Sequence, residues 1–140
     1  MKNLPKQPFA PRCSILVVDD EPGFREMLKW HLDTLGVEVE TAKDGEEAMT
    51  RAVKGNHLLV ITDVTMPRLN GIGLLEKLKE KNPETEVVIL TGFGSVETAV
   101  HAMKKGAADF ILKPFDLKHF MKTVREILGK LQEDQSKKFE

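Results

Sequence analysis

The clearest structural signal in the chain is the run Ile15-Leu16-Val17-Val18-Asp19-Asp20, in which four apolar residues lead directly into two carboxylates. Residues 58–61 and 87–90 form two further apolar runs of the same unbroken kind. Strands of this kind are typical of a parallel sheet that is covered on both faces. Residues 37–40 alternate instead and predict an edge strand with one wet face, and residues 107–112 predict a fifth strand.

The segments between these strands have helical periodicity. Apolar residues recur at steps of three and four over residues 24–35 and 96–103, which gives each segment a single apolar stripe. Gly36, Gly55 and Gly106 close helical segments where a left-handed cap is expected, and Ser95 can cap the helix that follows it. The alternation of strands and helices predicts an α/β fold, a (βα)5 three-layer sandwich with right-handed crossovers.

Length and composition favour one soluble domain. The chain has 140 residues and a formal net charge of −1, which argues against a basic nucleic-acid-binding module. A single cysteine rules out an internal disulfide framework, and no apolar run approaches the length of a membrane span, so we expect a cytoplasmic protein. We expect a flexible N-terminal arm over residues 1–12, a domain over residues 13–131, and a polar tail or linker start over residues 132–140.

Polar residues follow four of the predicted strands. In a parallel α/β sheet, ligands bind at the carboxyl ends of the strands, where this chain has Asp19, Asp20, Asp63, Thr91 and Lys113. Taken singly, each has an ordinary explanation as a helix cap, a turn residue or a surface lysine. Together they supply oxygen ligands suited to Mg²⁺ and an ammonium suited to phosphate oxygens, which is the equipment for forming an acyl phosphate on a carboxylate.

These residues lie in four motifs that resemble those of the receiver domain of two-component response regulators. The motifs are Leu16-Val17-Val18-Asp19-Asp20-Glu21-Pro22, Asp63-Val64-Thr65-Met66-Pro67 followed by Gly71, Ile89-Leu90-Thr91-Gly92, and Lys113-Pro114-Phe115. The resemblance covers roughly residues 13–131 and implies a doubly wound, flavodoxin-like fold with parallel sheet order 2-1-3-4-5. Residues 91–110 are most similar to the N-terminal receivers of the bacterial nitrogen-regulator type, which activate transcription.

The resemblance implies a role for each matched residue. Asp63 is expected to take a phosphoryl group from a phosphohistidine, with Thr91 and Lys113 in contact with that group. The expected Mg²⁺ ligands are Asp20, Asp63 and the main-chain carbonyl of Thr65, with Asp19 helping through water. Thr91 and Phe110 are expected to form the switch, and the Lys113–Pro114 bond is expected to be cis.

The implied function is a phosphorylation-activated switch that changes the surface around residues 92–131. The expected partners are a sensor histidine kinase or phosphotransfer protein and a downstream output domain or partner, with no nucleic acid or membrane bound directly. The chain would be no enzyme beyond self-catalysed phosphorylation and dephosphorylation. Apolar residues of the final helix (Leu117, Phe120, Val124, Ile127 and Leu131) follow a 3-4-3-4 spacing that allows packing on the sheet, a homodimer or a linker.

Three other functions are weighed against this one. An aspartyl-phosphate phosphatase of the haloacid dehalogenase type needs a second aspartate two residues after the nucleophile, where this chain has Thr65. A flavodoxin-like FMN carrier needs a phosphate-binding loop after the first strand, where this chain has the acidic run Asp19-Asp20-Glu21. A receiver-like interaction module that acts without phosphorylation usually lacks one of the core residues, and this chain keeps them all.

Overall fold

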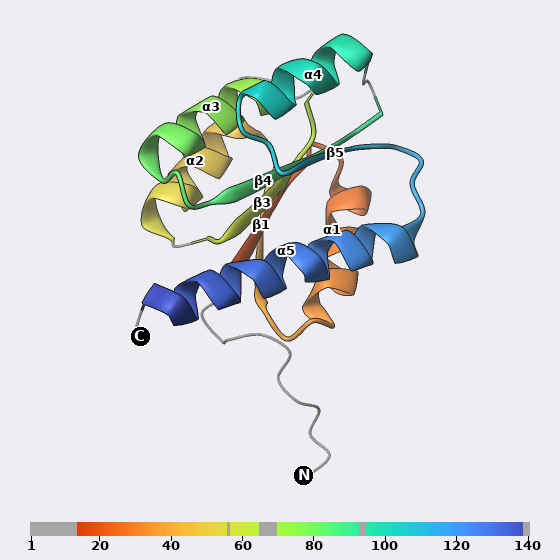
Figure 1. Cartoon of the computed structure of the whole chain (residues 1–140). Helices are drawn as coiled ribbons and strands as arrows, with labels where there is room; N and C mark the ends of the chain where they lie inside the picture. Colours follow the sequence, from red (N-terminus) through yellow and green to blue (C-terminus); the bar gives the residue numbers. More distant parts are fainter. Residues whose placement is uncertain (1–13, 56, 65–69, 93–94, 139–140) are drawn as a thin grey trace.

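The computed structural model describes residues 14–55, 57–64, 70–92 and 95–138. In that part of the chain, five parallel strands form one sheet in the order β2-β1-β3-β4-β5, and each strand is followed by a helix (Figure 1). The strands are β1 (Ser14–Val18), β2 (Glu38–Ala42), β3 (Leu59–Thr62), β4 (Glu86–Thr91) and β5 (Asp109–Leu112). The helices are α1 (Pro22–Asp33), α2 (Gly45–Lys54), α3 (Gly71–Lys81), α4 (Val96–Lys104) and α5 (Leu117–Lys138). The predicted fold class and sheet order are therefore confirmed.

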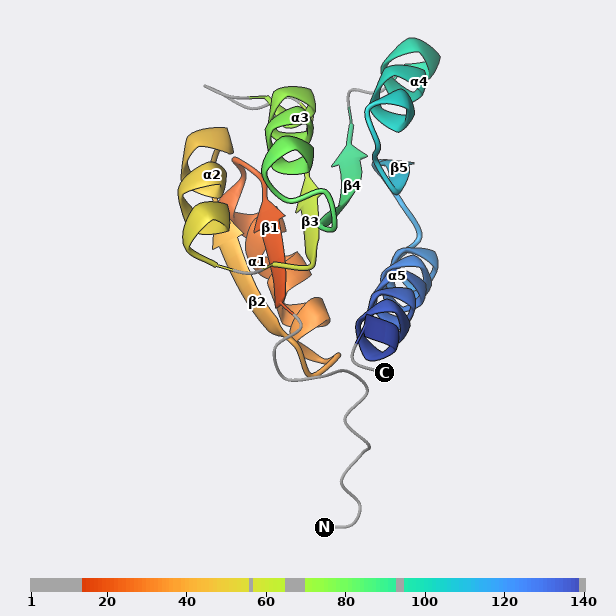
Figure 2. The same ribbon diagram turned by 60° about the vertical axis from the view of Figure 1, so that its left-hand side comes forward.

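The helices form two layers on opposite faces of the sheet, α1 and α5 on one face and α2, α3 and α4 on the other (Figures 1 and 2). The side chains of β1 show why both faces are apolar. Ile15 and Val17 lie in the core shared with α1 and α5, whereas Leu16 and Val18 lie in the core shared with the other three helices. An unbroken apolar strand therefore supplies both cores at once.

The two outer strands are less buried than the central ones. In β2, Val39 is buried whereas Glu38 and Glu40 are exposed, which confirms the predicted edge strand. The fifth strand begins at Asp109 and is shorter than predicted, because the Ala107 amide donates to the Ala102 carbonyl at the end of α4.

Three of the predicted helix ends form as expected and one does not. Ser95 accepts a hydrogen bond from the Thr98 amide, and Gly36 and Gly106 have φ angles of 79° and 104°. The prediction of a left-handed cap at Gly55 is wrong, because its φ is −100°. A Cβ at this position would lie 2.7 Å from Cε1 of His57 and 3.1 Å from the Arg51 carbonyl oxygen, so a side chain there would displace its neighbours.

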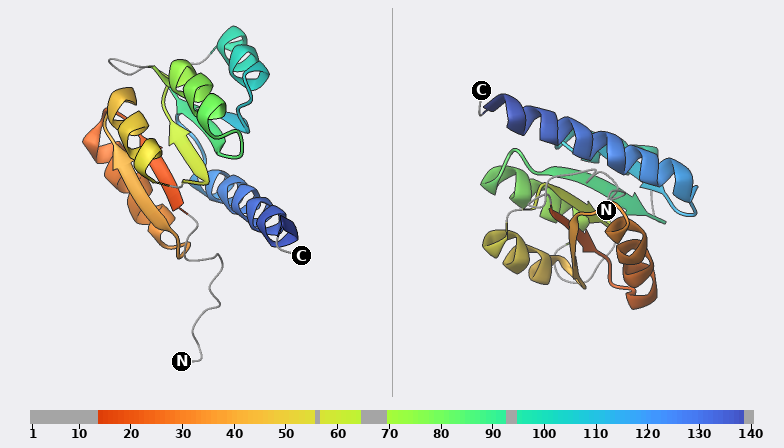
Figure 3. Two further views of the ribbon diagram at one scale, coloured as in Figure 1. Left: turned by 90° about the vertical axis from the view of Figure 1, so that its left-hand side faces the viewer. Right: turned by 90° about the horizontal axis from the view of Figure 1, so that it is seen from below.

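The apolar stripe of α5 packs on the sheet. Phe120 and Val124 are fully buried, and Leu117, Ile127 and Leu131 pack against the same core. Figure 3 shows α5 as a long helix along one face of the sheet. It continues to Lys138, through most of the segment expected to be a polar tail. The domain limits and the homodimer stay predictions, and the N-terminal arm lies outside the described residues.

Candidate functional site

Three of the predicted site residues are held in place by main-chain bonds that continue the sheet. The amide of Asp19 donates to the carbonyl of Ala42 at 3.1 Å, and that of Asp63 donates to Val18 at 3.2 Å. The amide of Lys113 donates to the carbonyl of Thr91, the last residue of β4, at 2.9 Å. Because the strands are parallel, all four residues lie at the same edge of the sheet.

The side chains of these residues contact one another. The Lys113 Nζ donates to Oδ2 of Asp19 at 3.0 Å and to Oδ2 of Asp63 at 3.3 Å. The Thr91 hydroxyl donates to Oδ1 of Asp63 at 2.6 Å. Asp19, Asp63 and Thr91 are 3%, 6% and 0% exposed. We call Asp19, Asp63, Thr91 and Lys113 the strand-end cluster.

The electrostatics of the cluster centre on the ammonium of Lys113. Burial lowers the pKa of this group, because a charged ammonium loses hydration. The hydrogen bond and charge of Asp19, together with those of Asp63, more than offset the burial and raise the pKa of Lys113 above its ordinary value. Lys113 is therefore a fixed positive charge beside both carboxylates at any physiological pH.

Asp19 serves the fold and the cluster together. Its Oδ1 accepts a hydrogen bond from the Glu21 amide at 2.9 Å, just before α1. The helix-cap interpretation of Asp19 is wrong, because the N-cap residue of α1 is Glu21 and no side chain makes a cap hydrogen bond there. The other carboxylate oxygen of Asp19 binds Lys113. The guanidinium of Arg25 donates to the Asp19 carbonyl at 2.7 Å and ties the first turn of α1 to the end of β1.

The two other predicted metal ligands, Asp20 and Thr65, are not part of the strand-end cluster. Asp20 is exposed beside the cluster, and Thr65 lies outside the described residues. Among the described residues, no three His, Cys, Asp or Glu side chains are grouped closely enough to hold a metal ion. The donor set still fits Mg²⁺, which phosphate sites hold with one or two carboxylates and several waters. The carboxylates of Asp19, Asp20 and Asp63 and the ammonium of Lys113 carry a net charge of −2, which a divalent cation would balance.

The predicted switch pair shares one face of the sheet. Thr91 pairs with Leu112 across the β4–β5 ladder, and Phe110 pairs with Ile89, two residues before Thr91. Residues two apart on a strand point to the same side, so Phe110 lies on the side of Thr91 that faces α3 and α4. Phe110 is partly buried against that core. The Lys113–Pro114 bond is cis, as the resemblance implies.

Two contacts of the site were not predicted from the sequence. A Cβ at Gly71 would lie 2.1 Å from the carbonyl oxygen of Asp63, so only glycine lets α3 begin this close to Asp63. The ring of Phe24 lies under the Lys113 ammonium, with Nζ 3.9 Å from the ring centroid. Two sequence features point toward these contacts. Gly71 belongs to the motif that contains Asp63, and Phe24 begins the apolar stripe of α1.

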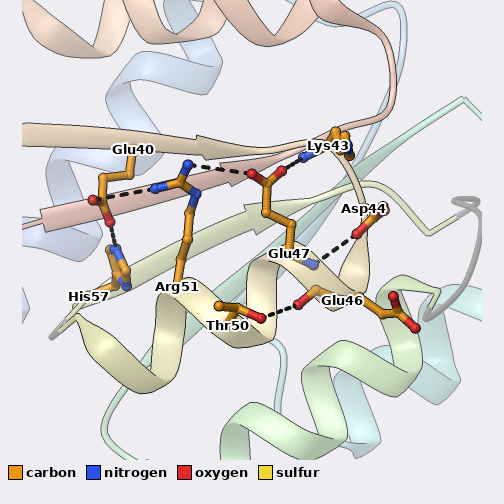
Figure 4. Close-up of polar contacts among 8 residues, drawn as sticks. All are labelled: Glu40, Lys43, Asp44, Glu46, Glu47, Thr50, Arg51 and His57. Carbon is orange, nitrogen blue, oxygen red and sulfur yellow. Dashed lines mark hydrogen bonds and ion pairs between the residues drawn. The ribbon is translucent and has the colours of Figure 1, made fainter.

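A second group of charged side chains joins β2 and α2 to His57, two residues before β3 (Figure 4). We call it the β2–α2 network, and it contains Glu40, Glu47, Arg51 and His57. Nε2 of His57 is hydrogen-bonded to Glu40, and Arg51 pairs with Glu47 at 3.4 Å and with Glu40 at 3.9 Å. It includes none of the predicted site residues.

Comparisons with known proteins agree with this geometry. The response regulator receiver domain family matches residues 15–125. The C4-dicarboxylate transport transcriptional regulatory protein DctD of Pseudomonas aeruginosa is 36% identical over 124 residues, which are 89% of this chain and 27% of that protein. The chain spans a quarter to a half of the length of the curated relatives first matched.

Solved structures of receivers have the same fold. A CheY-like receiver domain protein from Methanospirillum hungatei has a TM-score of 0.83 and 28% identity, over 87% of this chain and 98% of that one. The response regulator TrrA of Thermotoga maritima, solved in complex with Mg²⁺-BeF, has a TM-score of 0.75 and 33% identity, over 83% and 99%. Among the described residues, no helix is long and apolar enough to cross a membrane.

Proposed function

This chain belongs to the response regulator receiver domain family, with relatives of the nitrogen-regulator type, and we propose that it is a phosphorylation-activated signalling switch with Asp63 as its phosphoacceptor. The observation that carries the proposal is the environment of the Asp63 carboxylate. One of its oxygens accepts the Thr91 hydroxyl and the other accepts the Lys113 ammonium. A hydroxyl and a cation held this close to a carboxylate are also the donors that a phosphoryl group bound to it would need.

The proposed step is transfer of a phosphoryl group from a phosphohistidine. An Asp63 oxygen forms a bond to phosphorus while the phosphorus–nitrogen bond breaks. The electron pair stays on the imidazole nitrogen, which takes a proton from water. Lys113 balances charge on the transferring phosphoryl oxygens, and Thr91 donates to one of them. Bound Mg²⁺, held by Asp20, Asp63 and the Thr65 carbonyl with Asp19 acting through water, would neutralise further phosphoryl charge.

Phosphorylation then changes the preference of the Thr91 side chain. Its hydroxyl, which bonds Asp63 in the unphosphorylated protein, would bond a phosphoryl oxygen instead. The space that it leaves would admit the Phe110 ring from the neighbouring strand, and the surface of residues 92–131 would change with it. A ligand shifts such an equilibrium only through contacts that differ between the two states, and Thr91 supplies that contact.

The proposed partners follow from the family. A sensor histidine kinase or a phosphotransfer protein supplies the phosphoryl group, and an output domain or partner that controls transcription receives the signal. The chain itself would act in the cytoplasm without binding DNA or membrane. Its catalytic activity would be limited to its own phosphorylation and dephosphorylation.

The test is phosphorylation by acetyl phosphate with Mg²⁺, followed by intact mass and by hydrogen exchange over residues 92–110. We expect a gain of one phosphoryl group, lost with EDTA, and altered exchange across that segment. Thr91→Ala should gain the phosphoryl group without the altered exchange. A wild-type protein that gains no mass would favour the interaction module that acts without phosphorylation, and rapid turnover of acetyl phosphate would favour a phosphatase.

A further inference from the structure

The Lys113 ammonium has a third neighbour besides its two carboxylates. Nζ lies 3.9 Å from the centroid of the Phe24 ring, well inside the distance at which a cation is attracted to the electron-rich face of an aromatic ring. The carboxylates come from the ends of β1 and β3, whereas Phe24 comes from the first turn of α1. The ammonium is therefore held from three separate elements.

The Phe24 ring is itself fixed by packing. It meets the ring of Phe115 edge-on, with centroids 6.1 Å apart and planes at 84°. Phe115 in turn packs against Phe120 of α5, with ring centroids 5.2 Å apart, and Phe120 is fully buried. Next to Phe24, Arg25 ties the same turn of α1 to the main chain of Asp19. The ring is thus a rigid surface against which the lysine side chain rests.

We propose that Phe24 is a positioning residue, whose ring face holds the Lys113 ammonium over Asp63 and so speeds phosphoryl transfer; this inference rests on the function proposed above. A lysine side chain has a flexible four-carbon stem, and its order depends on what the ammonium contacts. When Asp63 is phosphorylated, the oxygens of the phosphoryl group also accept hydrogen bonds from the Lys113 ammonium. The ring contact is independent of Asp63, so it can keep the ammonium in position before and after transfer.

The sharpest test keeps the shape of the ring and changes its charge distribution. Phenylalanine with one, two or three ring fluorines at position 24 weakens the attraction for a cation stepwise with little change in size. We expect the rate of phosphorylation by acetyl phosphate to fall at each step, by about three- to tenfold in all. The same series at Phe120, whose ring packs on Phe115 one step further from the ammonium, is the matched control and should leave the rate unchanged. Equal rates across the series at position 24 would overturn the proposal.

A second measurement separates this proposal from the proposed function. NMR relaxation of the Lys113 ε-methylene group, in the unphosphorylated protein without metal, reports how well the ammonium is held. Phe24→Leu keeps the apolar volume and should make Lys113 more mobile, whereas Phe24→Tyr should keep it ordered. Equal order in the leucine and tyrosine variants would overturn the positioning role. If the wild type gains no phosphoryl group, the proposed function fails and the relaxation measurement still decides the role of Phe24.

Discussion

The strand-end cluster and the β2–α2 network are both groups of charged side chains, but they differ in burial. In the cluster, the side chains of Asp19, Asp63 and Lys113 are 4%, 8% and 22% exposed. In the network, the side chains of Glu40 and Arg51 are 46% and 41% exposed, and of the members with an ion pair only that of His57 is buried, at 2%. Buried charges interact strongly and are screened little by salt, whereas exposed ion pairs contribute little to the free energy of unfolding.

Burial of the charged groups, more than their number, therefore distinguishes the strand-end cluster as the candidate functional site. Two buried carboxylates are unfavourable unless a cation satisfies them, and Lys113 provides one. The network instead joins Glu40 of β2 to Arg51 of α2 and to His57, with Arg51 also pairing with Glu47 one turn earlier in α2. It even leaves two buried nitrogens, Nε of Arg51 and Nδ1 of His57, without a hydrogen-bond partner among the described residues.

The largest expected effect is that of removing the Asp20 carboxylate, which lies beside the strand-end cluster, and a carboxylate of the β2–α2 network serves as the control. Asp20→Ala should reduce Mg²⁺-dependent phosphorylation by about a hundredfold or more, because the metal carries several kcal/mol of charge stabilisation in such reactions. Asp20 is exposed, so the fold should remain intact. Glu47→Ala makes the same change in the β2–α2 network and should leave phosphorylation unaffected. Phosphorylation rates with acetyl phosphate decide, and an undiminished rate in Asp20→Ala would exclude this residue as a metal ligand.

The next effect concerns the close packing behind Asp63. Gly71→Ala would place a methyl group 2.1 Å from the Asp63 carbonyl oxygen, so the start of α3 or the Asp63 backbone must move. We expect a loss of about 3 kcal/mol in the free energy of unfolding, measured with urea. Gly23→Ala in the first turn of α1 meets nothing within 4 Å and should be neutral or slightly stabilising. Equal stabilities of the two variants would show that the space at Gly71 is not needed.

Lys113→Ala tests the cation of the cluster. The variant should fold, with a free energy of unfolding lower by about 2 kcal/mol at neutral pH, because two buried carboxylates lose their partner. It should fail to give the altered hydrogen exchange on phosphorylation. Since the folded-state pKa of Lys113 is raised, the stabilisation is complete below the ordinary lysine value of about 10.4 and is lost as pH rises through the folded-state value.

Urea unfolding of the wild type and of Lys113→Ala over a range of pH tests this pH dependence of the free energy of unfolding. The difference between the two proteins should stay constant from neutral pH to mildly alkaline pH and shrink only at strongly alkaline pH. A difference that already disappears near neutral pH would mean that the ammonium is not held by Asp19 and Asp63.

The smallest effect is expected in the β2–α2 network. Arg51→Met keeps most of the side-chain volume and removes exposed ion pairs with Glu40 and Glu47. We expect a change of about 0.5 kcal/mol or less in the free energy of unfolding, reduced further by added salt. A loss as large as that of Lys113→Ala would contradict the distinction drawn between the two regions.

The fold and the membership of the cluster could be predicted because both depend on local patterns. Unbroken apolar runs identify buried parallel strands, and a parallel sheet brings their last residues to one edge. Asp63 and Thr91 follow from this argument alone, and the structure confirms that they meet Lys113 there. The family motifs add the cis bond before Pro114, which no pattern of burial predicts.

The remaining contacts depend on how elements approach one another in space. Nothing in the spacing of α1 indicates that Phe24 lies under Lys113, a residue 89 positions away (113 − 24). The sequence predicts a positive φ at Gly55, but its φ is −100° and the nearby ring of His57 limits the space there instead. The contact of Gly71 with the Asp63 carbonyl likewise follows from the exact path of the backbone and from no periodic signal.

The most direct test of the account compares one acidic residue from each region as a phosphoacceptor. Wild type, Asp63→Asn and Glu40→Gln are incubated with acetyl phosphate and Mg²⁺, and the intact masses are measured. We expect a gain of one phosphoryl group in the wild type and in Glu40→Gln, and no gain in Asp63→Asn. An equal gain in Asp63→Asn would contradict the assignment of Asp63 as the phosphoacceptor.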